Sequence, residues 1–120
     1  MIHYFKENSN RPRRAIQAWL ILLGVAMNRQ TITYKDLSIK MYEHYAGGTL
    51  AEVLGHIAFY CNANGLPPLT CLVVNKETGL PGIGIPVSAD LNMLREEVYQ
   101  FDWYSIFPPT EEEMCETHLN

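Results

Sequence analysis

Three successive segments of this chain carry apolar residues at three- and four-residue spacing, the period of a helix with one buried face. The first segment shows it most clearly, through Ala15, Ile16, Trp19, Leu22, Leu23 and Ala26. Asn10 can cap this helix, and Pro12 then falls in its first turn, where a missing N–H is tolerated. Any fold of this chain therefore has to build its core around this first helix.

The second and third segments have start and stop signals of their own. Residues 33–36 resemble a capping box, and Gly47-Gly48 ends the second apolar stripe, which consists of Leu37, Met41 and Tyr45. Thr49 and Glu52 form a capping box in its full form, and Asn64-Gly65 stops the segment that follows. The third stripe consists of Leu50, Val53, Leu54, Ile57, Ala58 and Cys61. We expect three helices before residue 66.

An apolar run without helical period follows at residues 69–74, and its β-branched residues predict a buried strand. Residues 75–79 carry turn chemistry, and residues 80–86 form a return strand that its prolines confine to an edge. Ser88 can cap a further helix. This order predicts an α+β fold: a small winged-helix-like domain with three N-terminal helices, a β-hairpin wing and a fourth, C-terminal helix. In that architecture the third helix enters a groove of DNA.

A chain of 120 residues is long enough for one domain. We expect residues 1–108 to form this single winged-helix-like domain, with the aromatic segment 103–107 closing the core. Pro108-Pro109 ends the ordered part. Residues 109–120, which include Glu111 to Glu113, are therefore predicted to form an acidic flexible tail.

Composition excludes several classes of protein. With 48% apolar and 18% charged residues, the chain is neither disordered nor a coiled coil. Three cysteines spaced far apart make no disulfide framework and favour a reduced, cytoplasmic setting. The longest apolar run, residues 19–27, is far shorter than a membrane span, and no Ala-x-Ala cleavage site follows it. We therefore expect no membrane partner and no secretion signal.

Charge is distributed unevenly along the chain. Residues 1–60 hold seven Lys or Arg against four Asp or Glu, and residues 61–120 hold two against nine. A basic first half can meet phosphate, and an acidic second half repels it. The alternative interpretation is that both halves present ordinary solvated faces.

Residues 32–84 resemble the DNA-binding, active-site domain of alkylguanine-DNA alkyltransferases and alkyltransferase-like proteins. Residues 31–37 resemble the Thr-Tyr-Gly-Glu-Leu helix start of that family. Residues 54–59, followed by Asn62 and Asn64, resemble its Val-Gly-x-Ala-Leu recognition helix, and residues 72–84 resemble its Arg-Val-Val strand and Gly-rich wing. The resemblance covers about half the chain and implies a module that binds nucleic acid.

The chain departs from the family at the active site. Where the family has Pro-Cys-His-Arg before Val-Val, this chain has Leu69-Thr-Cys-Leu72, which places Thr70 at the acceptor position. An alkyl acceptor needs a thiolate, and Cys71 has no adjacent His or cation to lower its pKa. We expect Cys71 to be a small buried core side chain, so alkyl transfer is not implied and the protein is predicted not to be an enzyme.

A second departure concerns base flipping. Glu52 stands where the family has the Arg that fills the gap left by an extruded base. A carboxylate at this position would be repelled by the phosphates of DNA. The capping box explains Glu52 without a role in base flipping. The flipping step is therefore not implied for this chain.

Other chemistry is weakly supported. Cys115 and His118 have the spacing of half a zinc site, but no second pair lies close by, so no metal site is predicted. No glycine-rich phosphate loop opens a helix, and no cofactor is expected. His56 and Tyr60 share a helix face that adjoins core positions, which favours a hydrogen-bonded, partly buried His56.

The first interpretation is therefore a non-catalytic, alkyltransferase-like winged-helix module that binds double-stranded DNA. Its phosphate contacts would come from Arg11, Arg13, Arg14, Arg29, Lys35 and Lys40, with Lys76 on the wing. Thr49, Glu52 and His56 on the third helix would face the groove. This interpretation requires the basic side chains to lie on one surface with the third helix.

The alternative is a protein-interaction module, either a small adaptor or inhibitor or a homodimer, that uses the winged helix without DNA. It requires an exposed apolar patch near the wing or the aromatic segment. The net charge of −4 and the acidic tail favour it.

Overall fold

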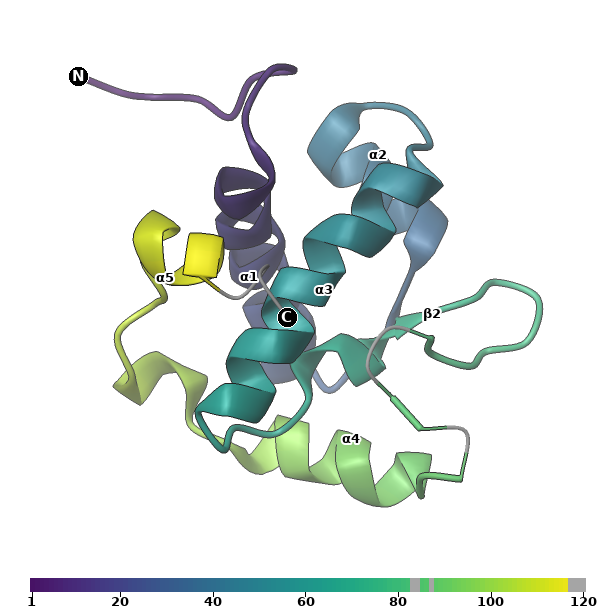
Figure 1. Ribbon diagram of the computed structural model, residues 1–120. Helices are drawn as coiled ribbons and strands as arrows, with labels where there is room; N and C mark the ends of the chain where they lie inside the picture. The colour runs from purple at the N-terminus through teal and green to yellow at the C-terminus, as the bar shows by residue number, and fades with distance from the viewer. Residues whose placement is uncertain (83–84, 87, 117–120) are drawn as a thin grey trace.

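The computed structural model describes residues 1–82, 85–86 and 88–116 (Figure 1). In this structure the first helix begins where the sequence predicts it. α1 spans Arg11–Met27, and the Asn10 side chain accepts a hydrogen bond from the Arg13 N–H at 2.9 Å. The predicted cap is thus confirmed. In the described part of the chain α1 is followed by β1 (Ile32–Thr33), α2 (Tyr34–Tyr42), α3 (Gly47–Ala63), the 3₁₀ helix η1 (Leu69–Leu72), β2 (Val73–Val74), α4 (Leu91–Gln100), the 3₁₀ helix η2 (Trp103–Ser105) and α5 (Glu111–Glu116).

α2 starts as predicted and ends earlier. The Thr33 hydroxyl accepts a hydrogen bond from the Asp36 N–H at 3.0 Å, which confirms the cap. The helix ends at Tyr42, with Glu43 in the left-handed conformation at φ 67°, instead of continuing to Gly47-Gly48. α3 then begins at Gly47, so Thr49 lies inside the helix and the predicted Thr49–Glu52 capping box is wrong.

Gly47 lies close to the Tyr45 side chain where α3 begins. A Cβ atom at this position would lie 2.5 Å from the Tyr45 hydroxyl, closer than any real contact. The pair of glycines that the sequence assigns to a helix end thus opens the next helix, and a side chain at position 47 would require the exposed Tyr45 ring to move.

The predicted β-hairpin wing is wrong. Residues 69–72 form η1, and only Val73–Val74 are extended, pairing in parallel with Ile32–Thr33 of β1. Beyond β2 the Asn75 side chain accepts hydrogen bonds from the N–H groups of Glu77 and Thr78, and the Asn75 N–H donates to the Leu80 carbonyl. These hydrogen bonds close a turn over residues 75–80, and no strand of the described residues returns along β2. Of the predicted return strand, residues 83 and 84 lie outside the described residues.

The fold class therefore differs from the winged-helix-like α+β domain that the sequence predicts. The described chain is mostly helical, and its one sheet has two parallel two-residue strands. Figure 1 shows the loop after β2 standing out from the body, while α4 crosses the lower end of the helices. α4 is capped by Asp90, whose carboxylate accepts from the Met93 N–H, instead of by Ser88.

The core lies between α1, α3 and η1, and each of these three elements contacts the other two. Trp19 of α1 meets Tyr60 of α3 and Trp103 of η2 edge to face, with ring centroids 5.6 and 5.5 Å apart. The Trp103 indole N–H donates to the Val98 carbonyl, which ties η2 to α4. Of the aromatic segment 103–107 that the sequence assigns to the core, Trp103 is buried there, while Tyr104 and Phe107 are exposed.

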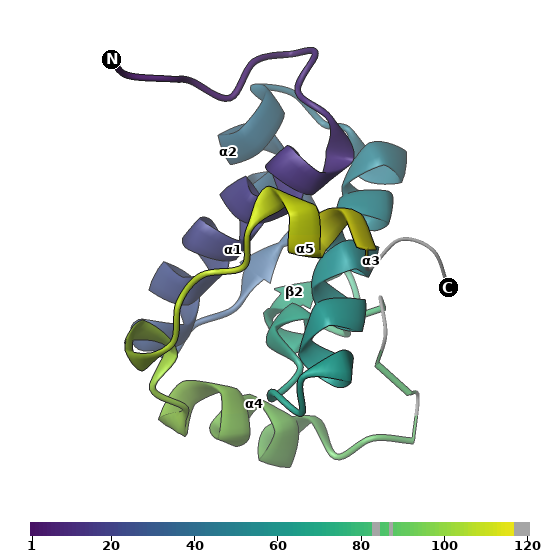
Figure 2. The same cartoon turned by 60° about the vertical axis from the view of Figure 1, so that its left-hand side comes forward.

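The C-terminal segment differs from the predicted flexible tail. Residues 111–116 form α5, which lies across α1 and α3 (Figure 2). Thr110 and Glu113 form a capping box: each backbone N–H donates to the other's side chain, at 3.0 and 3.1 Å. Met114 is fully buried, so packing fixes this segment. Residues 117–120 lie outside the described residues.

Within the described ranges, no helix is both long and apolar enough to span a membrane.

Candidate nucleic-acid interface

Arg14 does not belong to a phosphate-binding surface. Its side chain is only 4% exposed and donates hydrogen bonds to the carbonyl oxygens of Lys6 and Met41 and to the Gln17 side chain. The guanidinium also stacks on the Tyr42 ring, 4.4 Å from its centroid. The prediction of a phosphate contact is wrong for Arg14, because α1 turns this residue inward between the N-terminal segment and α2.

Three further arginines are held by carboxylates of the same chain. Arg11 lies 3.3 Å from Glu52 and Arg13 lies 3.0 Å from Glu111, while Arg29 pairs with Glu96. The hydrogen bond from Arg13, with a second from Asn10, lowers the pKa of the Glu111 carboxyl. In each of these exposed pairs the carboxylate offsets the positive charge of the arginine, so less positive charge is available to attract phosphate than the count of arginines suggests. By contrast, Lys35, Lys40 and Lys76 are exposed.

The predicted groove-facing residues of α3 do not lie together. Thr49 is exposed, and Glu52 is turned toward Arg11. His56 is only 2% exposed, and its Nδ1–H donates to the Met114 carbonyl of α5 at 2.7 Å. The prediction of a groove contact is therefore wrong for His56, which instead anchors α5.

A half-buried to exposed face of α3 borders Glu52. It is made of small or uncharged residues at helical spacing: Gly48, Ala51, Gly55, Ala58, Phe59 and Asn62. A Cβ atom at Gly48 or Gly55 would meet no other atom within 4 Å. Such a face lets another molecule approach the helix backbone closely. We name these six residues the α3 outer face.

A hollow of about 570 Å³ adjoins the C-terminal half of this face. It is lined by Gly55, Ala58, Phe59, Cys61, Asn62, Leu66, Pro68 and Thr70. Gly65, at φ 66°, reverses the chain after α3, and the following prolines lead it back to η1. The turn therefore brings Thr70 beside α3.

Cys71 is not placed for thiol chemistry. It is fully buried, and burial raises the pKa of its thiol to about 11 although the nearby Arg95 acts in the opposite direction. Burial likewise raises the pKa of Cys61 to about 11. Both thiols stay protonated and unreactive at neutral pH.

Metal ligands do not gather in the described ranges. No group of three or more His, Cys, Asp or Glu side chains lies close enough there to hold an ion. Of the pair with zinc-like spacing, Cys115 is exposed and His118 lies outside the described residues.

Comparisons with protein-family models, with curated proteins and with solved structures found no match. The resemblance to alkyltransferases thus stays a prediction. Spacing alone could have revealed the α3 outer face, because its glycines and alanines recur every three or four residues between apolar positions. The hollow could not be found this way, since it depends on how residues 64–70 turn back.

Proposed function

We propose that this chain is a non-catalytic module that binds double-stranded DNA through the α3 outer face. The observation that carries the proposal is a surface of small, uncharged side chains on α3, bordered by Glu52, beside a hollow that ends at Thr70. Small side chains allow a helix to enter a groove closely, and a hollow beside it has room for an unstacked base.

The arrangement of α2 and α3 supports the proposal. The two helices contact each other and are joined by only the four residues 43–46, as in helix–turn–helix motifs. In those motifs the second helix lies in the major groove. Here that helix is α3, and Lys35 and Lys40 are exposed on the helix before it.

The charge on α3 also bears on DNA. Glu52 alone would repel phosphate, but Arg11 lies 3.3 Å from its carboxylate and offsets that charge. Lys76 in the loop after β2 adds one more exposed cation. With few cations available, we expect a shallow dependence of affinity on salt.

A binding titration tests this proposal. Anisotropy of a labelled duplex is measured at ~50 mM salt, where phosphate contacts are strong, and a mismatched duplex is measured beside it. Ala58→Glu puts a charge on the α3 outer face, and we expect about tenfold weaker binding, the effect of ~1.4 kcal/mol. Leu20→Glu, at an exposed position of α1, is the matched control with the same charge change, and this variant should bind like the wild type.

Two results would contradict the proposal: no binding of either duplex by the wild type, or equal losses in Ala58→Glu and Leu20→Glu. Tighter binding of the mismatched duplex would support the use of the hollow by an unstacked base, since such a base costs less to extrude.

A protein-interaction module is the second candidate, because the aromatic segment carries exposed apolar rings. Tyr104 is 67% exposed and Phe107 is 90% exposed. Rings of this kind are enriched at protein interfaces. Sedimentation velocity over a concentration series tests the homodimer form: self-association that Phe107→Ser abolishes would favour this candidate, and a monomer at all concentrations would reject the homodimer.

A further inference from the structure

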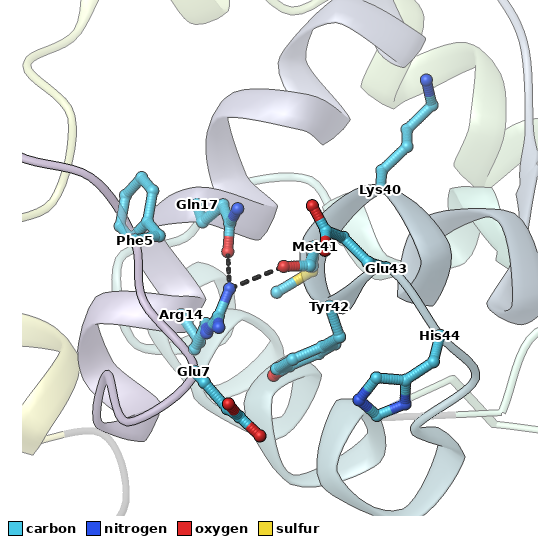
Figure 3. Close-up of a pocket in the computed structure, with 9 residues that line it drawn as sticks. All are labelled: Phe5, Glu7, Arg14, Gln17, Lys40, Met41, Tyr42, Glu43 and His44. Carbon is cyan, nitrogen blue, oxygen red and sulfur yellow. Dashed lines mark hydrogen bonds between the residues drawn. The ribbon is translucent and has the colours of Figure 1, made fainter.

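A cavity of about 550 Å³ lies away from the α3 outer face, between the N-terminal segment, α1 and the end of α2 (Figure 3). Its walls combine Phe5 and Tyr42 with Arg14 and Gln17 of α1. Lys40, Met41 and His44, together with Glu7 and Glu43, complete the lining. Its volume is in the range of small-molecule sites.

Arg14 brings an unbalanced charge to this cavity. All three acceptors of its guanidinium are neutral: the Lys6 and Met41 carbonyls and the Gln17 amide, each at 2.7 Å. Among the described residues none of the ion pairs involves Arg14, although Glu7 and Glu43 line the same cavity. Buried charges in proteins are as a rule paired with an opposite charge.

Two donors at this place also have no acceptor. Arg14 Nε and the Tyr42 hydroxyl are both buried, and neither meets a hydrogen-bond partner in the described part of the chain. Stacking holds the Tyr42 ring against the guanidinium, so the two donors belong to one cluster. Buried polar groups without partners are rare and ask for an explanation.

We propose that this cavity binds a small oxyanion, a carboxylate or a phosphate, with Arg14 as its anchor and the Tyr42 hydroxyl as a second donor. An oxyanion supplies the missing negative charge and accepts from both donors. Figure 3 shows the Arg14 guanidinium beside Gln17 and close to the Tyr42 ring, with Lys40 and His44 on the opposite side of the view. The N-terminal segment, which lines the cavity with Phe5 and Glu7, is exposed and covers the anchor from one side.

The proposal does not depend on DNA binding, because it uses no residue of the α3 outer face and its test contains no DNA. Thermal unfolding of the full chain is followed in sodium phosphate and in sodium acetate, each against sodium chloride at equal ionic strength. A ligand that binds only the folded state raises Tm, and above its Kd the rise continues with the logarithm of the ligand concentration. We expect such a rise with phosphate or acetate beyond that with chloride, and the anion with the larger rise identifies the preferred oxyanion.

Variants locate the effect. Tyr42→Phe keeps the ring that stacks on Arg14 and removes one donor, so we expect about tenfold weaker binding. Arg14→Met should abolish binding, while Arg13→Met, with the same charge change at the neighbouring exposed position, should keep it. If Arg14→Met does not fold, Tyr42→Phe alone decides. Equal Tm values in all three salts, or a rise that Tyr42→Phe leaves unchanged, would overturn the proposal.

Discussion

Arg13 and Arg14 are neighbours in the chain and have opposite roles. Successive helix residues point about 100° apart. Arg13 is therefore exposed and pairs with Glu111, while Arg14 is buried against Tyr42. His56 shows the same contrast with Thr49 on α3: one is buried under α5 and the other is exposed. At this scale a residue type predicts its possible partners, and its position on the helix decides which of them it meets.

The cysteines give a pH-dependent prediction at the residue scale. Burial raises the pKa of Cys61 and Cys71 from 9.0 to about 11, so the folded state favours their protonated thiols. The stability this contributes is complete below pH 9 and is lost as the pH rises toward 11. Urea titrations at a series of pH values should show the free energy of unfolding falling across that range.

Thiol labelling checks the same point independently. At pH 8 we expect the folded protein to react with a disulfide reagent at the exposed Cys115 only, and all three cysteines to react after unfolding. Cys115→Ser should remove the fast reaction. Fast labelling of Cys71 in the folded protein would contradict its burial.

At the scale of elements, α5 is the clearest case of structure that depends on tertiary contacts. A helix of six residues is not stable alone in water. Its capping box defines the start, and three contacts with the rest of the chain hold it: the burial of Met114, the His56 hydrogen bond to the Met114 carbonyl, and the Arg13–Glu111 pair. The parallel strands likewise exist only because residues 32–33 and 73–74 are brought together.

Truncation of Met114 tests how α5 is held. Met114→Ala should lower the free energy of unfolding by about 2–5 kcal/mol, because it leaves a cavity between α5 and the body. Cys115→Ala, at the exposed neighbouring position, is the control and should change it by less than about 0.5 kcal/mol. Equal small changes in urea denaturation of both variants would mean that α5 does not pack as described.

For the whole molecule, the described elements share one core. α1 contacts α2, α3, α4 and α5, and η1 is packed between α1, α3 and α4. The rings of Trp19 and Trp103 join the first helix to the C-terminal third of the chain. No described element has a separate core on which it could fold alone, so the chain should unfold as one unit.

The two tryptophans make this prediction measurable. Both are buried, so their fluorescence reports the core, while far-ultraviolet circular dichroism reports all helices. We expect the thermal transitions from the two signals to coincide. A fluorescence transition that comes several degrees before the loss of helix would reject a single cooperative unit.

The sequence by itself determined the local structure whose signals lie within one or two turns. Asn10 and Thr33 cap the helices predicted for them, and the apolar periods of α1 and α3 mark their buried sides. The capping box of Thr110 and Glu113 was present in the sequence as well, although the acidic run around it favoured a tail.

Tertiary structure alone decided the rest. Residues 69–74 became a 3₁₀ turn and a short parallel strand because their pairing partner is β1, far back in the chain, and not the segment that follows. Arg14 and His56 are buried against other helices instead of facing solvent, and the exposed Glu52 pairs with Arg11 of α1. Local patterns carry information about hydrogen bonds and periods nearby, while burial and charge pairing depend on segments that only the folded chain brings together.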